Sequence, residues 1–176
     1  MAPRPTIRAA PTGDVLRRRM LLVAWITLAL AALHFIDHAV RGYYVIDHGL
    51  DPSWNHSGWP FLPEFTPFTA SLFGVCGLLG VGLWLTYRGR VGAGYWLATA
   101  VLLGALVVWV HFLGPQAETP TVIYRSWDNP VPGVLAVVNT IAVIAAVLAM
   151  GINAALVARR SGWRAAGPPI AGTGRS

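Results

Sequence analysis

Lysine is absent from this chain of 176 residues, and all 13 basic residues are arginine. Charged residues make up only 11% of the sequence, against about 25% in a soluble domain. Such a chain cannot cover a soluble surface with charge, so its composition argues against a soluble enzyme. Apolar residues make up 55% and the mean hydropathy is +0.56, which is typical of a membrane protein that exposes much of its surface to lipid.

Cysteine is nearly absent too. The single thiol, Cys76, excludes an intrachain disulfide and a metal site built from several cysteines. The sequence also has no Walker A motif, no GxGxxG, no GxSxG and no HExxH. Function therefore has to be inferred from where the few polar residues lie.

Four apolar runs are each long enough to cross about 30 Å of hydrocarbon, which takes about 20 helical residues. Because backbone groups in lipid must be satisfied within their own segment, and because no alternating strand pattern is present, we expect these runs to be helices. The sequence predicts an all-α integral membrane protein, a four-helix bundle with spans at about 20–40, 66–87, 92–113 and 133–157.

The remaining segments divide into two tails and two long loops. The tails, 1–19 and 158–176, are rich in Pro, Gly, Ala and Arg, and we expect them to be disordered. The loops, 41–65 and 114–132, carry aromatic residues and prolines, and we expect them to fold over one end of the bundle as a cap.

Arginine placement predicts the orientation of the bundle. Eleven of the 13 arginines precede the first span, follow the fourth, or lie in the short turn between the second and third. Only Arg41 and Arg125 lie on the other side. By the positive-inside rule both termini are cytoplasmic and the two long loops face outward. We expect the protein in a cell membrane, and the Arg- and Ala-rich, Lys-free composition suggests a bacterial plasma membrane.

Two other interpretations of the basic residues are weaker. Contact with nucleic acid is not expected, because the tails hold few arginines and no nucleic-acid-binding motif accompanies them. A cleaved signal peptide is suggested by Arg17–Arg19, the apolar run after them and the sequence Ala29–Ala31. The apolar run continues past that point to Ile36, which favours a retained helix.

The histidines give the strongest functional signal. All five fall in the half of the chain predicted to face outward: His34, His38, His48, His56 and His111. At about 100° per residue, His34, Asp37, His38 and Arg41 share an arc of roughly 100° on the first helix. Thr27 lies on the same face, two turns away. Ionisable residues within a membrane span are costly and usually face the bundle interior or a cavity.

This pattern predicts a metal site. Histidines at i and i+4 can direct both imidazoles at one ion, and imidazole ligands without thiolate suit Zn, Cu or Fe. His111, near the outer end of the third span, is the expected third ligand. Asp37 is expected to orient a ligand histidine or to pair with Arg41. The loops offer four further ligands: His48, His56, Glu64 and Glu118.

Several alternatives stay open. A b-type haem held between His111 and one of the first-helix histidines is a second version of the same site, while the absence of Cys-x-x-Cys-His excludes covalent c-type attachment. The histidines are otherwise structural polar residues of an accessory subunit that packs against other membrane subunits or against copies of itself. A small transporter is a third class, and it is disfavoured because the inner half of the spans lacks ionisable residues.

Overall fold

The computed structural model describes residues 12–47, 67–114 and 117–165, and all the regular structure in these ranges is helical. In chain order the elements are α1 (Thr12–Asp47), α2 (Pro67–Tyr87), α3 (Ala93–Val108), the π-helical turn η1 (Trp109–Leu113), α4 (Pro120–Arg125) and α5 (Pro130–Ala165). Four stretches are long and apolar enough to cross a membrane: Val15–Arg41, Thr69–Tyr87, Ala93–Leu113 and Pro130–Arg160. The predicted all-α architecture with four spans is confirmed at this level.

The helices do not end where the apolar runs end. α1 includes residues 12–19, predicted to be a disordered tail, and residues 41–47, predicted to be loop. α5 starts at Pro130 and continues to Ala165, and α4 lies within the predicted loop 114–132. The length of an apolar run indicates which residues can lie in lipid. The backbone hydrogen bonds of a helix continue through polar residues as well, so these helices extend beyond the apolar runs. The rest of both predicted tails and of loop 41–65 lies outside the described residues.

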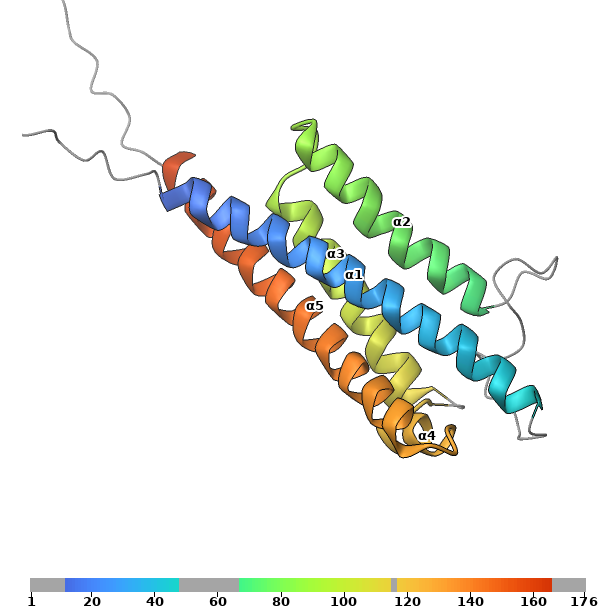
Figure 1. The fold of residues 1–176 in the computed structure, drawn as a ribbon. Coiled ribbons are helices and arrows are strands. Elements are labelled where there is room, and N and C mark those ends of the chain that lie inside the picture. The colour runs from blue at the N-terminus through green and yellow to red at the C-terminus, as the bar shows by residue number, and fades with distance from the viewer. Residues whose placement is uncertain (1–11, 48–66, 115–116, 166–176) are drawn as a thin grey trace, which may run out of the picture.

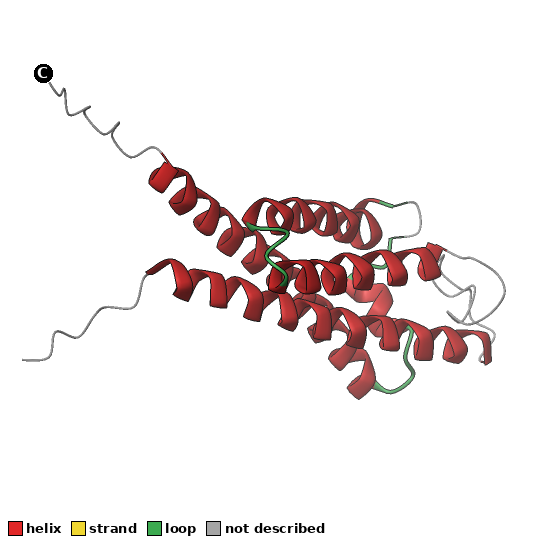
Figure 2. Cartoon of the chain, turned by 90° about the horizontal axis from the view of Figure 1, so that it is seen from above, coloured by secondary structure: helices red, strands yellow, loops and turns green. Residues whose placement is uncertain are grey.

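The bundle has two distinct ends (Figure 1). The start of α1, the turn between α2 and α3, and the end of α5 lie together at the terminal end. The end of α1, η1, α4 and the start of α5 lie at the opposite end, called the distal end below. α5 packs against both α1 and α3, and α2 packs mainly against α1. The view from above shows the same long helices running side by side (Figure 2).

The turn between α2 and α3 is tight because glycine permits it. Gly89 has φ of 68°, a conformation that side chains with a Cβ adopt rarely. The Gly89 and Arg90 amides then donate to the Thr86 and Leu85 carbonyls at 3.1 and 2.9 Å, which satisfies the open end of α2.

Apolar packing fills the terminal half of the bundle. Trp96 and Met150 are fully buried there, and the Trp96 indole N–H donates to Thr86 Oγ1 at 2.9 Å, so its one polar atom is satisfied. α5 turns one face to the core, and its buried positions are Gly133, Ala136, Thr140, Val143, Ala146, Val147, Met150 and Ala154. Large apolar side chains on the other faces, such as Leu102, Leu135 and Leu148, are more than half exposed. Exposed hydrocarbon along whole helices is the surface expected of a protein in lipid.

At Gly82 the ring of Tyr95 on α3 packs against the backbone of α2, and this contact can be tested. A Cβ at Gly82 would overlap the ring of Tyr95, which is held in place because its hydroxyl donates to the Leu78 carbonyl at 2.6 Å. We expect Gly82→Ala to destabilise the protein by about 1–3 kcal/mol through overpacking. Thermal unfolding in detergent, followed by circular dichroism, measures the effect.

The matched control is Gly80→Ala on the same helix, where an added Cβ has nothing within 4 Å. It should be neutral or slightly stabilising, because alanine favours helix over glycine. Equal melting temperatures for the two variants would contradict the close packing of Tyr95 on α2.

Candidate functional site

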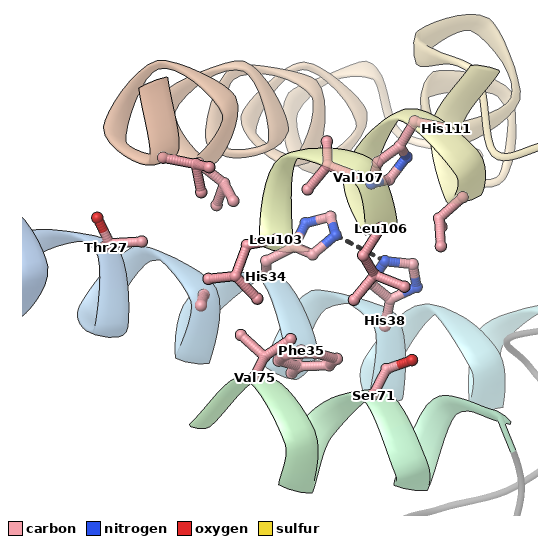
Figure 3. Close-up of a pocket in the computed structure, with 14 residues that line it drawn as sticks. Thr27, His34, Phe35, His38, Ser71, Val75, Leu103, Leu106, Val107 and His111 are labelled. Carbon is pink, nitrogen blue, oxygen red and sulfur yellow. Dashed lines mark hydrogen bonds between the residues drawn. The ribbon is translucent and has the colours of Figure 1, made fainter. Parts of the chain in front are cut away.

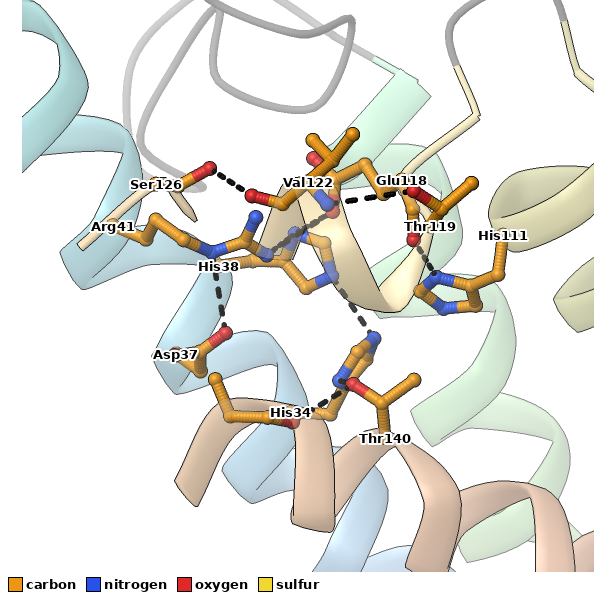
Figure 4. Close-up of polar contacts among 11 residues, drawn as sticks. His34, Asp37, His38, Arg41, His111, Glu118, Thr119, Val122, Ser126 and Thr140 are labelled. Carbon is orange, nitrogen blue, oxygen red and sulfur yellow. Dashed lines mark hydrogen bonds and ion pairs between the residues drawn. The ribbon is translucent and has the colours of Figure 1, made fainter. Parts of the chain in front are cut away.

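The polar face of α1 points into the bundle at its distal end (Figure 4). His34, His38 and Arg41 are 9%, 3% and 0% exposed. Leu33 and Val40, on the outer side of the same helix, are about half exposed. Three residues of the predicted polar arc are therefore buried, and the fourth, Asp37, is partly buried, as expected for ionisable groups within a membrane span.

His111 reaches the same region from α3 through a change in helix type. The last turn of α3 widens into the π-turn η1, closed by the Gly114 amide donating to the Trp109 carbonyl at 2.7 Å. Within η1, His111 is buried while Phe112 is half exposed. Single π-turns in α-helices occur frequently at functional sites because they redirect side chains.

Glu118 is fully buried and fastened to η1 by its backbone. Its amide donates to the Val110 carbonyl at 2.9 Å, and its carbonyl lies 2.9 Å from His111 Nδ1. Since a carbonyl can only accept, His111 carries its proton on Nδ1 and a lone pair on Nε2. Thr119 then caps α4 by accepting from the Val122 amide, with Pro120 in the first turn.

Arg41 joins α1 to the segment that precedes α4. Its guanidinium donates to Glu118 Oε2 at 3.1 Å, and its Nε lies 3.3 Å from Asp37 Oδ2. The Asp37–Arg41 pairing expected from i,i+4 spacing is thus present. The three side chains formally sum to one negative charge. A buried charge is tolerated only when it is paired, so two carboxylates that share one guanidinium are stabilised either by a further cation close by or by a proton on one of them.

The two α1 histidines contact each other directly. Their Nε2 atoms are 2.9 Å apart, and the ring centres are separated by 4.4 Å. His34 Nδ1 lies 3.4 Å from Thr140 Oγ1 on α5, whose own proton goes to the Ala136 carbonyl at 2.9 Å. Thr140 Oγ1 is therefore an acceptor for His34 Nδ1–H, which leaves a lone pair on His34 Nε2.

His38 Nδ1 has two neighbours of opposite character. It lies 3.3 Å from the carboxylate oxygen Glu118 Oε2 and 3.1 Å from the guanidinium nitrogen Arg41 Nη2. If Nδ1 carries the proton, it donates to Glu118, and two lone pairs meet between His38 and His34. That arrangement requires a proton or a metal ion between the rings. If Nδ1 accepts from Arg41, then His38 Nε2–H donates to His34 and the chain of hydrogen bonds is complete without one.

A cavity of about 60 Å³ lies beside the histidines. Figure 3 shows His34, His38 and His111 on one side of it, with Phe35, Val75 and Leu106 around the rest. Its other lining residues are Thr27, Ala31, Ser71, Leu103, Val107, Val110, Val143 and Val147. The cavity is thus lined by the polar histidines of the distal end on one side and mainly by apolar side chains elsewhere.

The structure brings together three of the predicted ligands. The His111 ring centre is 5.3 Å from that of His34 and 6.5 Å from that of His38. Within the described part of the chain, Asp37 pairs with Arg41, and no contact with a histidine nitrogen is found there. The loop candidates His48, His56 and Glu64 lie outside the described residues. The fourth loop candidate, Glu118, lies within the cluster and contacts His38.

One member of the site was not predicted from sequence. Thr140 is the α5 partner of His34, and the more polar Asn139 stands beside it in the sequence. Thr140 is buried in phase with Ala136, Val143 and Val147, and Asn139 is only half-buried. The signal available in the sequence was therefore the apolar spacing of α5, which places position 140 on its buried stripe.

The imidazoles of His34, His38 and His111 are not arranged as three ligands of one ion in this structure. Across residues 12–47, 67–114 and 117–165, no group of three His, Cys, Asp or Glu side chains could hold a metal ion. A b-type haem does not fit the space either. A cavity of about 150 Å³ accommodates benzene, and the one here, at about 60 Å³, is too small for a tetrapyrrole.

Comparison with known proteins adds no further constraint, because no family model, curated protein or solved structure matches this chain. The geometry of the distal end is therefore the basis for any functional inference.

Arg41 should be the most sensitive position for stability at the distal end. Arg41→Met leaves Glu118 buried without its cation, and we expect a loss of about 3–5 kcal/mol. Chemical unfolding in detergent micelles measures it. Arg125→Met, at an exposed position on α4, is the matched control and should stay within about 0.5 kcal/mol of the parent.

The double variant Arg41→Met/Glu118→Gln separates charge from packing. Removing the Glu118 charge as well should recover part of the stability lost in Arg41→Met, since the fully buried carboxylate is then gone and only the partly exposed Asp37 lacks its partner. If adding Glu118→Gln to Arg41→Met lowers the free energy of unfolding further, instead of restoring part of it, the two side chains do not act as a pair.

Proposed function

We propose that this chain is a small multipass membrane protein that binds one transition-metal ion between His34 and His38 at the distal end of its bundle. The observation that carries the proposal is the pair of Nε2 atoms at 2.9 Å, next to two carboxylates, Asp37 and Glu118, that share the guanidinium of Arg41. Two imidazole ligands on one tetrahedral ion, at about 2.0–2.1 Å each, have nitrogens roughly 3.3 Å apart. A small outward movement of either ring makes room for the ion.

The hydrogen bonds around the histidines support the same proposal. Metal-bound histidines commonly donate their second ring N–H to a carboxylate or a backbone carbonyl. His111 does so to the Glu118 carbonyl, and His38 Nδ1 lies 3.3 Å from the Glu118 carboxylate. Glu118 therefore orients two of the three rings. His111 is the third ligand in this proposal, and it reaches the ion after a shift of η1 or through a bound water.

Orientation in the membrane is part of the proposal. The terminal end of the bundle carries the arginine-rich ends and the turn with Arg88 and Arg90, as Figure 1 and the sequence together indicate. We place this end in the cytoplasm of a bacterial cell and the histidine site toward the outer leaflet.

Metal analysis tests the site directly. The full chain, purified in detergent and stripped of metal, is dialysed against Zn(II), Cu(I) or Fe(II), and the bound metal is counted by mass spectrometry. We expect about one ion per chain for at least one of these metals. His34→Ala and His38→Ala should abolish binding, and Glu118→Gln should weaken it roughly 10- to 100-fold by loosening the ligand rings.

Two control variants should retain the metal. Cys76→Ser removes the single thiol, and Val40→Ala truncates a half-exposed side chain on α1. A wild-type chain that stays metal-free after reconstitution with all three ions would overturn the proposal. Loss of metal in Cys76→Ser, with retention in His38→Ala, would assign the binding to the thiol.

A specific observation favours a second candidate, an accessory subunit whose histidines are structural. The chain of hydrogen bonds from Arg41 through His38 and His34 to Thr140 is complete without any ion when His38 Nδ1 accepts. In that case His38→Gln preserves a donor and an acceptor and should keep the melting temperature. Added metal should not change the melting temperature of the wild type, whereas a bound ion would raise it.

The orientation has its own test. In a Cys76→Ser background, Ser53→Cys lies between the first two spans and Ser176→Cys at the end of the chain. We expect a membrane-impermeant maleimide to label Ser53→Cys in intact bacterial cells, and Ser176→Cys only after permeabilisation. The reverse labelling pattern would invert the proposed topology.

A further inference from the structure

The cavity beside the histidines points to the chemical class of molecule that this site handles. We infer that it binds a small neutral molecule of two or three heavy atoms, of the dioxygen type, next to the proposed metal ion. This inference rests on the proposed function for the role of the metal, but the cavity can be tested without it.

Size limits the ligand. The cavity measures about 60 Å³. A single water molecule needs roughly 10–15 Å³, and a cavity of about 150 Å³ holds benzene or xenon. The space is therefore sufficient for a diatomic or triatomic molecule and too small for an aromatic ring or a sugar.

The residues that line the cavity favour a ligand of low polarity. Most of the lining is hydrocarbon, from residues such as Leu103, Val107 and Val147. The Thr27 hydroxyl donates to the Val23 carbonyl at 2.8 Å, so its proton is already used. A buried water needs two to four polar partners, and charged groups cost several kcal/mol to desolvate. Away from the histidines, these walls favour a neutral molecule with little hydrogen-bonding capacity.

Access favours the same class. Phe35 on α1, Val75 on α2 and Leu106 on α3 are only partly buried where they line the cavity (Figure 3). This side of the cavity lies among apolar helices rather than behind a polar channel. Small apolar molecules concentrate in hydrocarbon, so the bilayer itself supplies them to an opening among these helices.

Position connects the cavity to the histidines. His34, His38 and His111 all line it, so a molecule inside lies against the imidazoles that form the proposed metal site. A metal site with two or three protein ligands leaves a coordination position open, as catalytic zinc sites do. The cavity is the space on this chain into which such a position would open.

Xenon binding to the metal-free protein tests the cavity alone. The full chain in nanodiscs, labelled on leucine and valine methyl groups, is pressurised with xenon and followed by NMR. We expect saturable shifts at Leu106 and Val147, beyond those of the exposed Leu148. Val75→Phe should fill the cavity and abolish the saturable shifts. Val81→Phe, at a half-exposed position on the same helix, is the matched control and should keep them.

Carbon monoxide tests the connection to the metal. On the Cu(I)-loaded protein we expect one C–O stretching band, retained in Val81→Phe and lost in Val75→Phe at unchanged copper content. If Val75→Phe does not fold, Ser71→Ile, one turn away on the same wall, replaces it.

The outcomes separate the two proposals. A protein that retains no metal but shows the xenon shifts refutes the proposed function and leaves the cavity as a ligand site. A protein that retains copper but shows neither xenon shifts nor a carbon monoxide band overturns the inference. Equal xenon shifts in all variants, or none because an acyl chain fills the space, overturn it as well.

Discussion

The buried pairing of Arg41 with Glu118 is the interaction on which the distal end of this protein depends. Arg41 has no solvent exposure, and neither does Glu118. A guanidinium without water needs a partner at hydrogen-bond distance, and the carboxylate at 3.1 Å provides it. To make this contact α1 must stay helical as far as Arg41, and the chain after η1 must turn inward before α4. The ion pair thus joins the distal part of α1 to the segment between η1 and α4.

The same pair determines what the histidines can do. Glu118 contacts His38 with its carboxylate and His111 with its backbone carbonyl, so one residue orients two rings. Its charge, together with that of Asp37, exceeds the single charge of Arg41. When His38 Nδ1 donates to Glu118, a shared proton or a metal ion between the His34 and His38 rings offsets this charge. When His38 Nδ1 accepts from Arg41, the hydrogen-bond chain needs no cation between the rings. The choice between an ion-binding site and a structural hydrogen-bond chain therefore follows from where His38 carries its proton.

Helical periodicity was sufficient to predict the α1 side of this site. Residues at i, i+4 and i+7 share one face of any regular helix, so His34, His38 and Arg41 had to lie together. Two other contributions depend on departures from regularity. The π-turn that directs His111 inward has no sequence signature here, and Glu118 is positioned by backbone hydrogen bonds in a non-helical segment. Thr140 was missed because no residue of the fourth span was assigned to the site, although the apolar spacing of α5 places position 140 on its buried stripe and Asn139 one position off it.

The distribution of buried ionisable groups argues against transport. Among the described residues all five of them, His34, His38, Arg41, His111 and Glu118, lie at the distal end. The terminal half is filled by side chains such as Leu83, Trp96 and Met150, which offer no relay for ions or protons. Because the polar cluster stops partway through the bundle, the proposed site would receive its ligand from the distal side or from the lipid. In this proposal the site holds a group or acts on a small molecule in place, because the apolar core beyond it provides no exit.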